Sequence, residues 1–219
     1  MRARTAFGLV RLGLAAAGSI ALFGYFQYTL GVATFAIANF FSYFTVQSAI
    51  VSVMVFLTAA VVALRRPTDP AWLDMLRAMV TTYILVSGVV YGIIVWQSSA
   101  ANYSIDVPWS SQLLHFVLPV CALIDWIVDP YKARLPWNYL GWAIVFPVLW
   151  LVFTLLRGPI VRWYPYFFLD ARQVSGPGET VFYCVIIVGI ITGIAALLTW
   201  ITRFKRIPRH VLPPWRASV

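Results

Sequence analysis

The sequence predicts an all-α fold, a polytopic transmembrane bundle of six helices with both termini in the cytoplasm. Three observations support this prediction: the composition, six long apolar runs and an uneven distribution of positive charge. Of the 219 residues, 62% are hydrophobic and 11% are charged, whereas soluble domains are about 45–50% apolar and about 25% charged. The mean hydropathy of +0.85 excludes an ordinary soluble domain. Apolar runs that are continuous rather than alternating disfavour a β-barrel.

Six apolar runs come close to the roughly 20 residues that a helix needs to cross a bilayer. They cover about residues 10–30, 41–64, 76–96, 112–129, 138–156 and 180–202. Segments rich in Pro, Gly or charge separate them, at 65–70, 129–130, 157–159 and 176–179. The sequence therefore predicts one transmembrane domain over residues 1–205 and a basic cytoplasmic tail over 206–219.

The first run has some features of a cleavable leader, because Arg2 and Arg4 precede an apolar stretch that contains three successive alanines. Arg11 would interrupt the apolar core of such a leader, and the run continues to Leu30. We therefore expect this segment to remain as the first span.

Positive charge predicts the orientation in an inner (plasma) cell membrane. Thirteen of the 16 Lys and Arg residues fall on the side of the two termini, and only Arg157, Arg162 and Arg172 fall on the other side. Because short cytoplasmic loops are enriched in Lys and Arg, both termini are expected to be cytoplasmic. The net charge of +9 is then a topology signal and a contact for anionic membrane lipids, and no nucleic-acid partner is expected.

The three outer arginines lie in the long loop 157–179, which also contains Trp163, Tyr164 and Tyr166. Two interpretations stay open for this aromatic loop. It is either an anchor at the level of the lipid headgroups or a lid that folds back over the bundle.

Scarce polar residues inside the apolar runs identify a candidate site. Thr45 lies near the start of the second span and His115 near the start of the fourth. Both spans run from outside to inside, so the two side chains are expected at similar depth, which permits contact. A histidine inside a membrane span is a candidate functional residue. The alternatives are a structural histidine that bridges two helices and a threonine that bonds back to its own helix.

Other intramembrane residues give weaker signals. Gln47 is expected to face the bundle interior, because its amide has four hydrogen-bonding positions to satisfy. Asp125 lies ten residues after His115, about 15 Å deeper on the same helix, and is expected to pair with Arg134 or with helix ends. Gly189 and Gly193 form a small-residue pattern that predicts a close helix contact.

The sequence contains no phosphate-binding loop, dinucleotide fingerprint, zinc-ligand pair or Gly-x-Ser-x-Gly turn. It therefore disfavours an ATPase, a redox carrier, a metalloprotease and an α/β-hydrolase. No metal and no cofactor are expected, and the oligomeric state stays open.

Four stretches together resemble one family. They are Phe41 to Ser48, the pattern His115-x3-Pro119-x5-Asp125-Trp126, the pair Pro136-Trp137, and Gly158 followed by 163–170 and Gly176. Over about residues 10–205 the chain resembles the bacterial branch of six-span membrane proteins related to the androgen-induced and androgen-dependent membrane hydrolases of animals.

The resemblance implies a threonine hydrolase that cleaves fatty acyl esters, with Thr45 as nucleophile and His115 as base. Candidate supporting or substrate-binding residues are Tyr43, Gln47, Ser48, Gln112, Asp125, Trp163, Tyr164 and Tyr166. A Thr hydroxyl is a weak nucleophile that needs such a base, and the base usually needs a third, orienting group. A membrane transporter and a non-catalytic lipid-binding protein remain alternatives.

Overall fold

The computed structural model describes residues 2–33, 35–100 and 106–204. Within these ranges, six helical segments are long and apolar enough to cross a membrane. They are α1 (Arg2–Leu30), α3 (Phe44–Arg65), α4 (Ala71–Ala100), the segment Trp109–Val128, α7 (Tyr139–Val161) and α8 (Pro177–Phe204). The all-helical, six-span class is confirmed. The predicted tail 206–219 lies outside the described residues.

The fourth span consists of three consecutive pieces. They are α5 (Trp109–Gln112), a π-helical turn η1 (Leu113–Val117) and α6 (Leu118–Val128). Two short elements lie between spans, α2 (Ile37–Phe40) and the 3-10 turn η2 (Phe167–Leu169).

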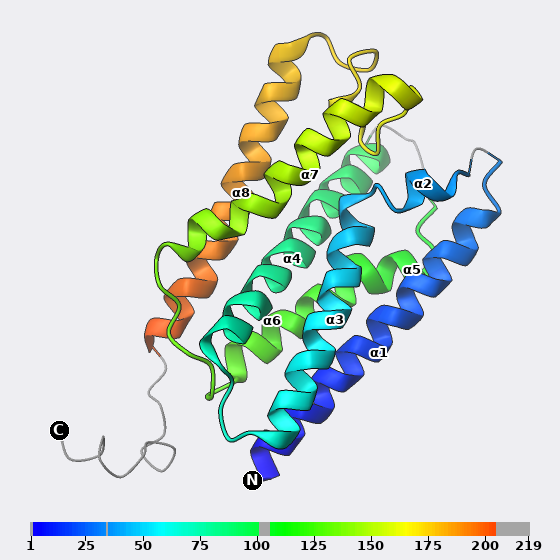
Figure 1. Ribbon diagram of the computed structural model, residues 1–219. Coiled ribbons are helices and arrows are strands. Elements are labelled where there is room, and N and C mark those ends of the chain that lie inside the picture. The colour runs from blue at the N-terminus through cyan, green and yellow to red at the C-terminus, as the bar shows by residue number, and fades with distance from the viewer. Residues whose placement is uncertain (1, 34, 101–105, 205–219) are drawn as a thin grey trace.

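Helix α4 lies at the centre of the bundle and packs against α3, α6, α7 and α8 (Figure 1). Helix α1 runs alongside α3, and α7 and α8 form a hairpin on the other side of α4 (Figure 1). The start of α1 and the end of α8 lie at the same end of the bundle, here called the terminal end. The opposite end, with α2 and the segment 162–176, is called the loop end.

The core changes in character along the bundle. Small residues bring helices close together near the terminal end, where Ala78, Ala143 and Ala195 are fully buried in one cluster. Aromatic side chains fill the loop end, where Phe44 and Trp150 belong to another cluster. Helices α7 and α8 bury only 22% and 17% of their most apolar windows, so the hairpin presents mainly apolar side chains outward, as expected against lipid.

A buried ion-pair network, which joins Arg4, Arg11 and Arg77 to Asp69, Asp74, Asp125 and Asp129, closes the terminal end. The expectation that Asp125 pairs with Arg134 was wrong: Asp125 receives Arg77 at 2.7 Å and Arg11 at 3.2 Å. The guanidinium groups of Arg11 and Arg77 can be buried beside Asp125 because carboxylates neutralise the charge of each one. A lone Asp125 at that depth would be costly, and the network is the physical reason it is tolerated.

Three of these carboxylates converge as metal ligands do, but around an arginine. Asp69, Asp74 and Asp129 each offer an oxygen to one small volume. The Nη1 atom of Arg77 lies 3.0 Å from Asp69, 3.0 Å from Asp74 and 2.9 Å from Asp129. A guanidinium nitrogen therefore takes the position that a bound cation would need. Burial raises the pKa of Asp129, but Arg77 and Arg11 lower it more, so the net shift is downward.

The small-residue pattern in α8 does not make the contact expected of it. A Cβ atom added at Gly189 or Gly193 would meet nothing within 4 Å, because this face of α8 points away from the rest of the chain. The prediction of a close helix contact within the chain was wrong for these two glycines.

Candidate active site

Thr45 lies at the start of α3, in the second helical position after Tyr43. The chain enters this helix at a fixed angle, because Trp150 Nε1 donates to the Ser42 carbonyl oxygen at 2.9 Å and Phe44 packs in the aromatic cluster. Thr45 is 7% exposed, and its hydroxyl points to neighbouring helices rather than back along α3. The interpretation of Thr45 as an ordinary back-bonded helix threonine therefore does not apply.

His115 occupies the middle of the π-helical turn η1. Pro119 follows four residues later, and its ring lacks an N–H for the His115 carbonyl oxygen and crowds it. That carbonyl oxygen lies directly against Gly88 of α4, at a point where any Cβ atom would collide with it. The π turn and Gly88 together bring the His115 backbone close to α4.

The contacts of the His115 ring define its tautomer. Nδ1 lies 2.9 Å from the Ser111 carbonyl oxygen, which can only accept, so Nδ1 carries the proton. Nε2 is then free to accept, and it lies 3.3 Å from Thr45 Oγ1. Tyr91 stacks on the imidazole with ring centroids 3.9 Å apart. Thr45 and His115, which were expected at similar depth, thus lie within hydrogen-bond distance of each other.

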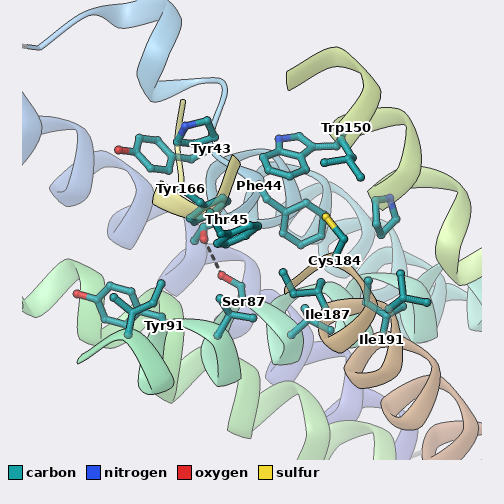
Figure 2. A pocket seen from close by; sticks show the side chains of 18 of the residues that line it. Tyr43, Phe44, Thr45, Ser87, Tyr91, Trp150, Tyr166, Cys184, Ile187 and Ile191 are labelled. Carbon is teal, nitrogen blue, oxygen red and sulfur yellow. Dashed lines mark hydrogen bonds between the residues drawn. The ribbon is translucent and has the colours of Figure 1, made fainter. Parts of the chain in front are cut away.

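Thr45 Oγ1 has a full set of polar neighbours. Ser87 Oγ lies 2.6 Å away (Figure 2), and the Tyr166 side chain lies beside Thr45. A threonine hydroxyl has one proton to donate and two lone pairs to accept. If Ser87 donates to Thr45 Oγ1, the Thr45 proton is free to point to His115 Nε2. In this arrangement the imidazole is placed to take the proton.

Tyr166 reaches the site from the segment between α7 and α8. Burial raises the pKa of Tyr166 to about 12, and hydrogen bonds from Thr45 and from the backbone amides of Thr45 and Phe44 oppose that rise. These amides belong to the first turn of α3, where N–H groups have no partner within the helix. Tyr166 therefore lies beside the first turn of the helix that carries Thr45.

The aromatic loop folds into the bundle at this point. Phe168 and Leu169 are buried, at 5% and 3% exposed, and Thr180 donates to the Phe168 carbonyl oxygen at 2.8 Å. Of the two interpretations open at the sequence level, this geometry matches the segment that folds back over the bundle. Trp163 and Tyr164 are not among the residues that line the cavity beside this segment. Trp163 packs edge-on to Tyr43, and Tyr164 lies over Gly158.

These polar groups form one wall of a partly open cavity of about 300 Å³, a volume at the lower end of small-molecule sites. Its 22 lining residues come from α1, α3, α4, η1, α7, α8 and the segment 162–176. Among the residues that the structure assigns to its wall, none is Lys, Arg, Asp or Glu.

Only part of the supporting set expected from the sequence lies at this cavity. Tyr43 and Tyr166 line it together with Thr45 and His115. The remaining polar candidates bond elsewhere: Gln47 to the Phe41 carbonyl, Ser48 to the Thr45 carbonyl, Gln112 to the Val107 carbonyl, and Asp125 in the ion-pair network. Gln47 does not turn into the bundle interior as expected, because a nearby backbone carbonyl satisfies its amide.

Ser87, Tyr91 and Ser111 are site residues that the sequence reasoning missed. Ser87 lies next to Gly88 within the third apolar run, and this polar and small pair is the signal that could have drawn attention to it. Its position along the span did not suggest contact with Thr45. Helix α4 continues for 13 residues beyond Ser87 to Ala100, about 20 Å of helix, whereas Thr45 lies at the very start of its span.

Fold and site together define a helical bundle of the multi-pass membrane type with a buried hydroxyl–imidazole pair at one end. The chain matches no protein-family model, no curated protein and no solved structure.

Proposed function

We propose that this protein is an integral membrane hydrolase that cleaves fatty acyl esters, with Thr45 as nucleophile and His115 as general base. One observation carries the proposal: Thr45 Oγ1 lies 3.3 Å from the acceptor nitrogen of His115, at the wall of an apolar cavity. The resemblance to membrane threonine hydrolases assigns these roles to the same two residues. Nucleophile and base within hydrogen-bond reach are the usual signature of covalent acyl transfer.

The reaction proceeds in two steps. Thr45 Oγ attacks the ester carbonyl carbon while His115 Nε2 takes the hydroxyl proton, and His115 then returns that proton to the departing alcohol. The product of this step is an ester between the acyl group and Thr45. Water attacks the same carbonyl carbon with His115 again as base, which releases the carboxylic acid and restores the Thr45 hydroxyl.

Three groups support this chemistry. The Ser111 carbonyl oxygen, 2.9 Å from Nδ1, orients the imidazole and stabilises its protonated form. The Tyr166 hydroxyl and the first backbone amides of α3 are donors next to Thr45, where negative charge develops on the carbonyl oxygen. A helix N-terminus favours negative charge, and preorganised donors at this position act as an oxyanion hole.

We further propose that the chain resides in the cell membrane with both termini in the cytoplasm, as the Lys and Arg distribution indicates. The site lies at the start of α3, at the loop end of the bundle and opposite the start of α1 and the end of α8. With this orientation the cavity lies in the half of the bundle nearer the outer face, within reach of esters dissolved in the bilayer.

Hydrolysis of 4-nitrophenyl octanoate by purified protein in detergent tests the assignment. Thr45→Ala and His115→Ala should each lower turnover by about 1,000-fold, the scale of loss for members of such a unit. Thr58→Ala is the matched control, because Thr58 lies on the exposed side of α3 and bonds back to Met54. A fluorophosphonate probe should label Thr45 in the wild type and not in His115→Ala.

Full turnover of every ester by a folded Thr45→Ala variant would remove Thr45 as nucleophile. The apolar cavity would then favour the second candidate, a transporter or a non-catalytic lipid-binding protein. Proteoliposome flux of an apolar solute that is retained in Thr45→Ala would identify the transporter.

A further inference from the structure

The cavity has a polar end and an apolar end. Its hydrogen-bonding groups gather where Thr45, Ser87 and His115 meet. The apolar end lies between α7 and α8, and Figure 2 shows Cys184, Ile187 and Ile191 along α8 on that side. Helix α7 faces them with Ile144, Pro147, Val148 and Leu151. A further part of the cavity is lined by Tyr25 of α1 and by Val90 and Ile94 of α4.

The apolar end has a defined length. Its lining runs from residue 144 to 151 on α7 and from residue 184 to 191 on α8. On each helix the first and last of these residues are seven steps apart, a length of about 10 Å. Beyond it the helices close together, because Ala143 and Ala195 are 0% exposed within one cluster. Ile191, 1% exposed, forms the floor one turn before Ala195.

The wall chemistry restricts the occupant. No charged side chain lines the cavity among the described residues, and a charge buried there would be costly without a partner. The occupant is therefore uncharged within the cavity. It places a hydrogen-bonding group near Thr45 and an apolar portion between α7 and α8, which is the form of a single acyl chain joined to an ester.

We infer that the space between α7 and α8 is a size-limited pocket for one linear acyl chain of about eight to ten carbons, with Ile191 as its floor. At about 1.3 Å per methylene, from a C–C bond of about 1.5 Å, 10 Å holds about eight methylene groups. A cavity of about 300 Å³ holds about ten groups the size of a water molecule. The inference rests on the proposed function only in placing the ester carbonyl at Thr45.

Hydrolysis of 4-nitrophenyl esters from C4 to C16 measures the pocket. The wild type should prefer C8–C10 and hydrolyse the C16 ester at least tenfold more slowly. Ile191→Ala should move the optimum two to four carbons longer, and Ile191→Phe should move it to about C6. Ile191→Val is a milder truncation with a smaller shift in the same direction, and it covers the case in which Ile191→Ala is unstable.

Ile186→Ala is the matched control, because Ile186 is on the same helix, is 40% exposed and does not line the cavity. Its chain-length profile should equal that of the wild type. Equal relative rates across the series, unchanged by any Ile191 variant while hydrolysis still requires Thr45, would overturn the inference and leave the proposed function intact.

A binding measurement tests the pocket independently of hydrolysis, and so covers the case in which the proposed function is wrong and the pocket is real. The chain has two cysteines, so Cys121→Ala combined with Thr45→Ala leaves Cys184 in the wall as the single thiol of an inactive protein. 1-Decanol should slow labelling of Cys184 by N-ethylmaleimide at least fivefold, and 1-butanol should have little effect. Such protection, in a protein whose wild type hydrolyses no ester, would support the pocket and reject the hydrolase. Equal protection by all alcohols, or none, would reject the pocket.

Discussion

At the residue scale, the site depends on a place where two backbones meet without a side chain between them. The His115 carbonyl oxygen lies against Gly88, and any Cβ atom there would collide with it. Backbone atoms cannot rotate away as the end of a side chain can, so a larger residue has to push α4 and η1 apart. The side chains of Ser87, which precedes Gly88, and of His115 would move with these backbones.

Gly88→Ala should therefore lower ester hydrolysis by at least tenfold and lower the unfolding temperature, because the collision is with backbone. Gly92→Ala, one turn further along α4, places its Cβ atom at an ordinary 3.7 Å from Phe116 and should match the wild type in both measurements. Equal behaviour of the two variants in thermal unfolding and turnover would contradict this account.

Ser87 has a narrower role than Gly88, because it contacts Thr45 but not the imidazole. Ser87→Ala removes the hydroxyl that lies 2.6 Å from Thr45 Oγ1, and without this hydrogen bond the threonine hydroxyl is free to rotate away from His115. Turnover should fall about tenfold, with about 1 kcal/mol of stability lost for one hydrogen bond. Ser99→Ala on the same helix, an exposed serine bonded to Val95, should leave the rate unchanged.

The proximity of Thr45 and His115 could be anticipated from the sequence, because a histidine within a span is rare and both residues begin spans that run in the same direction. Ser87 could not, since a serine in an apolar helix usually bonds to its own backbone. Ser52 does so, with the Ser48 carbonyl oxygen at 2.7 Å. Apart from the glycine that follows Ser87, nothing along the chain distinguishes the two serines. The approach of α3 to α4 decides which of them contacts Thr45.

At the element scale, the ends of the helices follow charge pairing more than hydropathy. The sequence places the first span at about 10, whereas α1 begins at Arg2, because Arg4 and Arg11 are neutralised inside the bundle. The third span begins at Ala71 rather than at 76, since Asp74 and Arg77 pair one turn apart. A hydropathy window treats each of these charges as unpaired.

Arg77 is the centre of the network that joins α1, α4 and α6. Arg77→Met would leave four carboxylates around a buried space, and breaking a buried ion pair on one side costs about 3–5 kcal/mol. Thermal unfolding in detergent should show a large loss of stability. Arg65→Met, at an exposed position in the last turn of α3, should change stability by less than about 0.5 kcal/mol. Similar unfolding temperatures for the two variants would show that the network contributes little.

At the scale of the whole molecule, the two ends of the bundle differ in kind. Ion pairs close the terminal end, whereas the loop end holds the cavity and its aromatic cover. The number and order of the spans could be predicted from the apolar runs alone. The lateral arrangement could not, because apolar faces on α7 and α8 resemble those on α4, and only packing decides which of them meet lipid.

Orientation can be tested with one pair of exposed alanines in a chain whose two native cysteines are replaced. Ala171→Cys lies in the loop-end segment and Ala71→Cys at the start of α4, at the terminal end. If the termini are cytoplasmic, a membrane-impermeant maleimide should label Ala171→Cys on intact cells. Ala71→Cys should react only after the cells are permeabilised. The reverse pattern would invert the proposed topology.

The ion-pair network also imposes an order on assembly. Arg11 contacts Asp69, Asp125 and Asp129, which lie 58, 114 and 118 residues further along the chain. The ribosome delivers α1 first, so Arg11 emerges before any of these carboxylates has been made. Until then its long side chain can keep the charge in the water at the bilayer surface. The pairing of Arg11 with Asp125 and Asp129 can therefore form only after the fourth span has been made, whereas its pairing with Asp69 needs only the loop that follows α3.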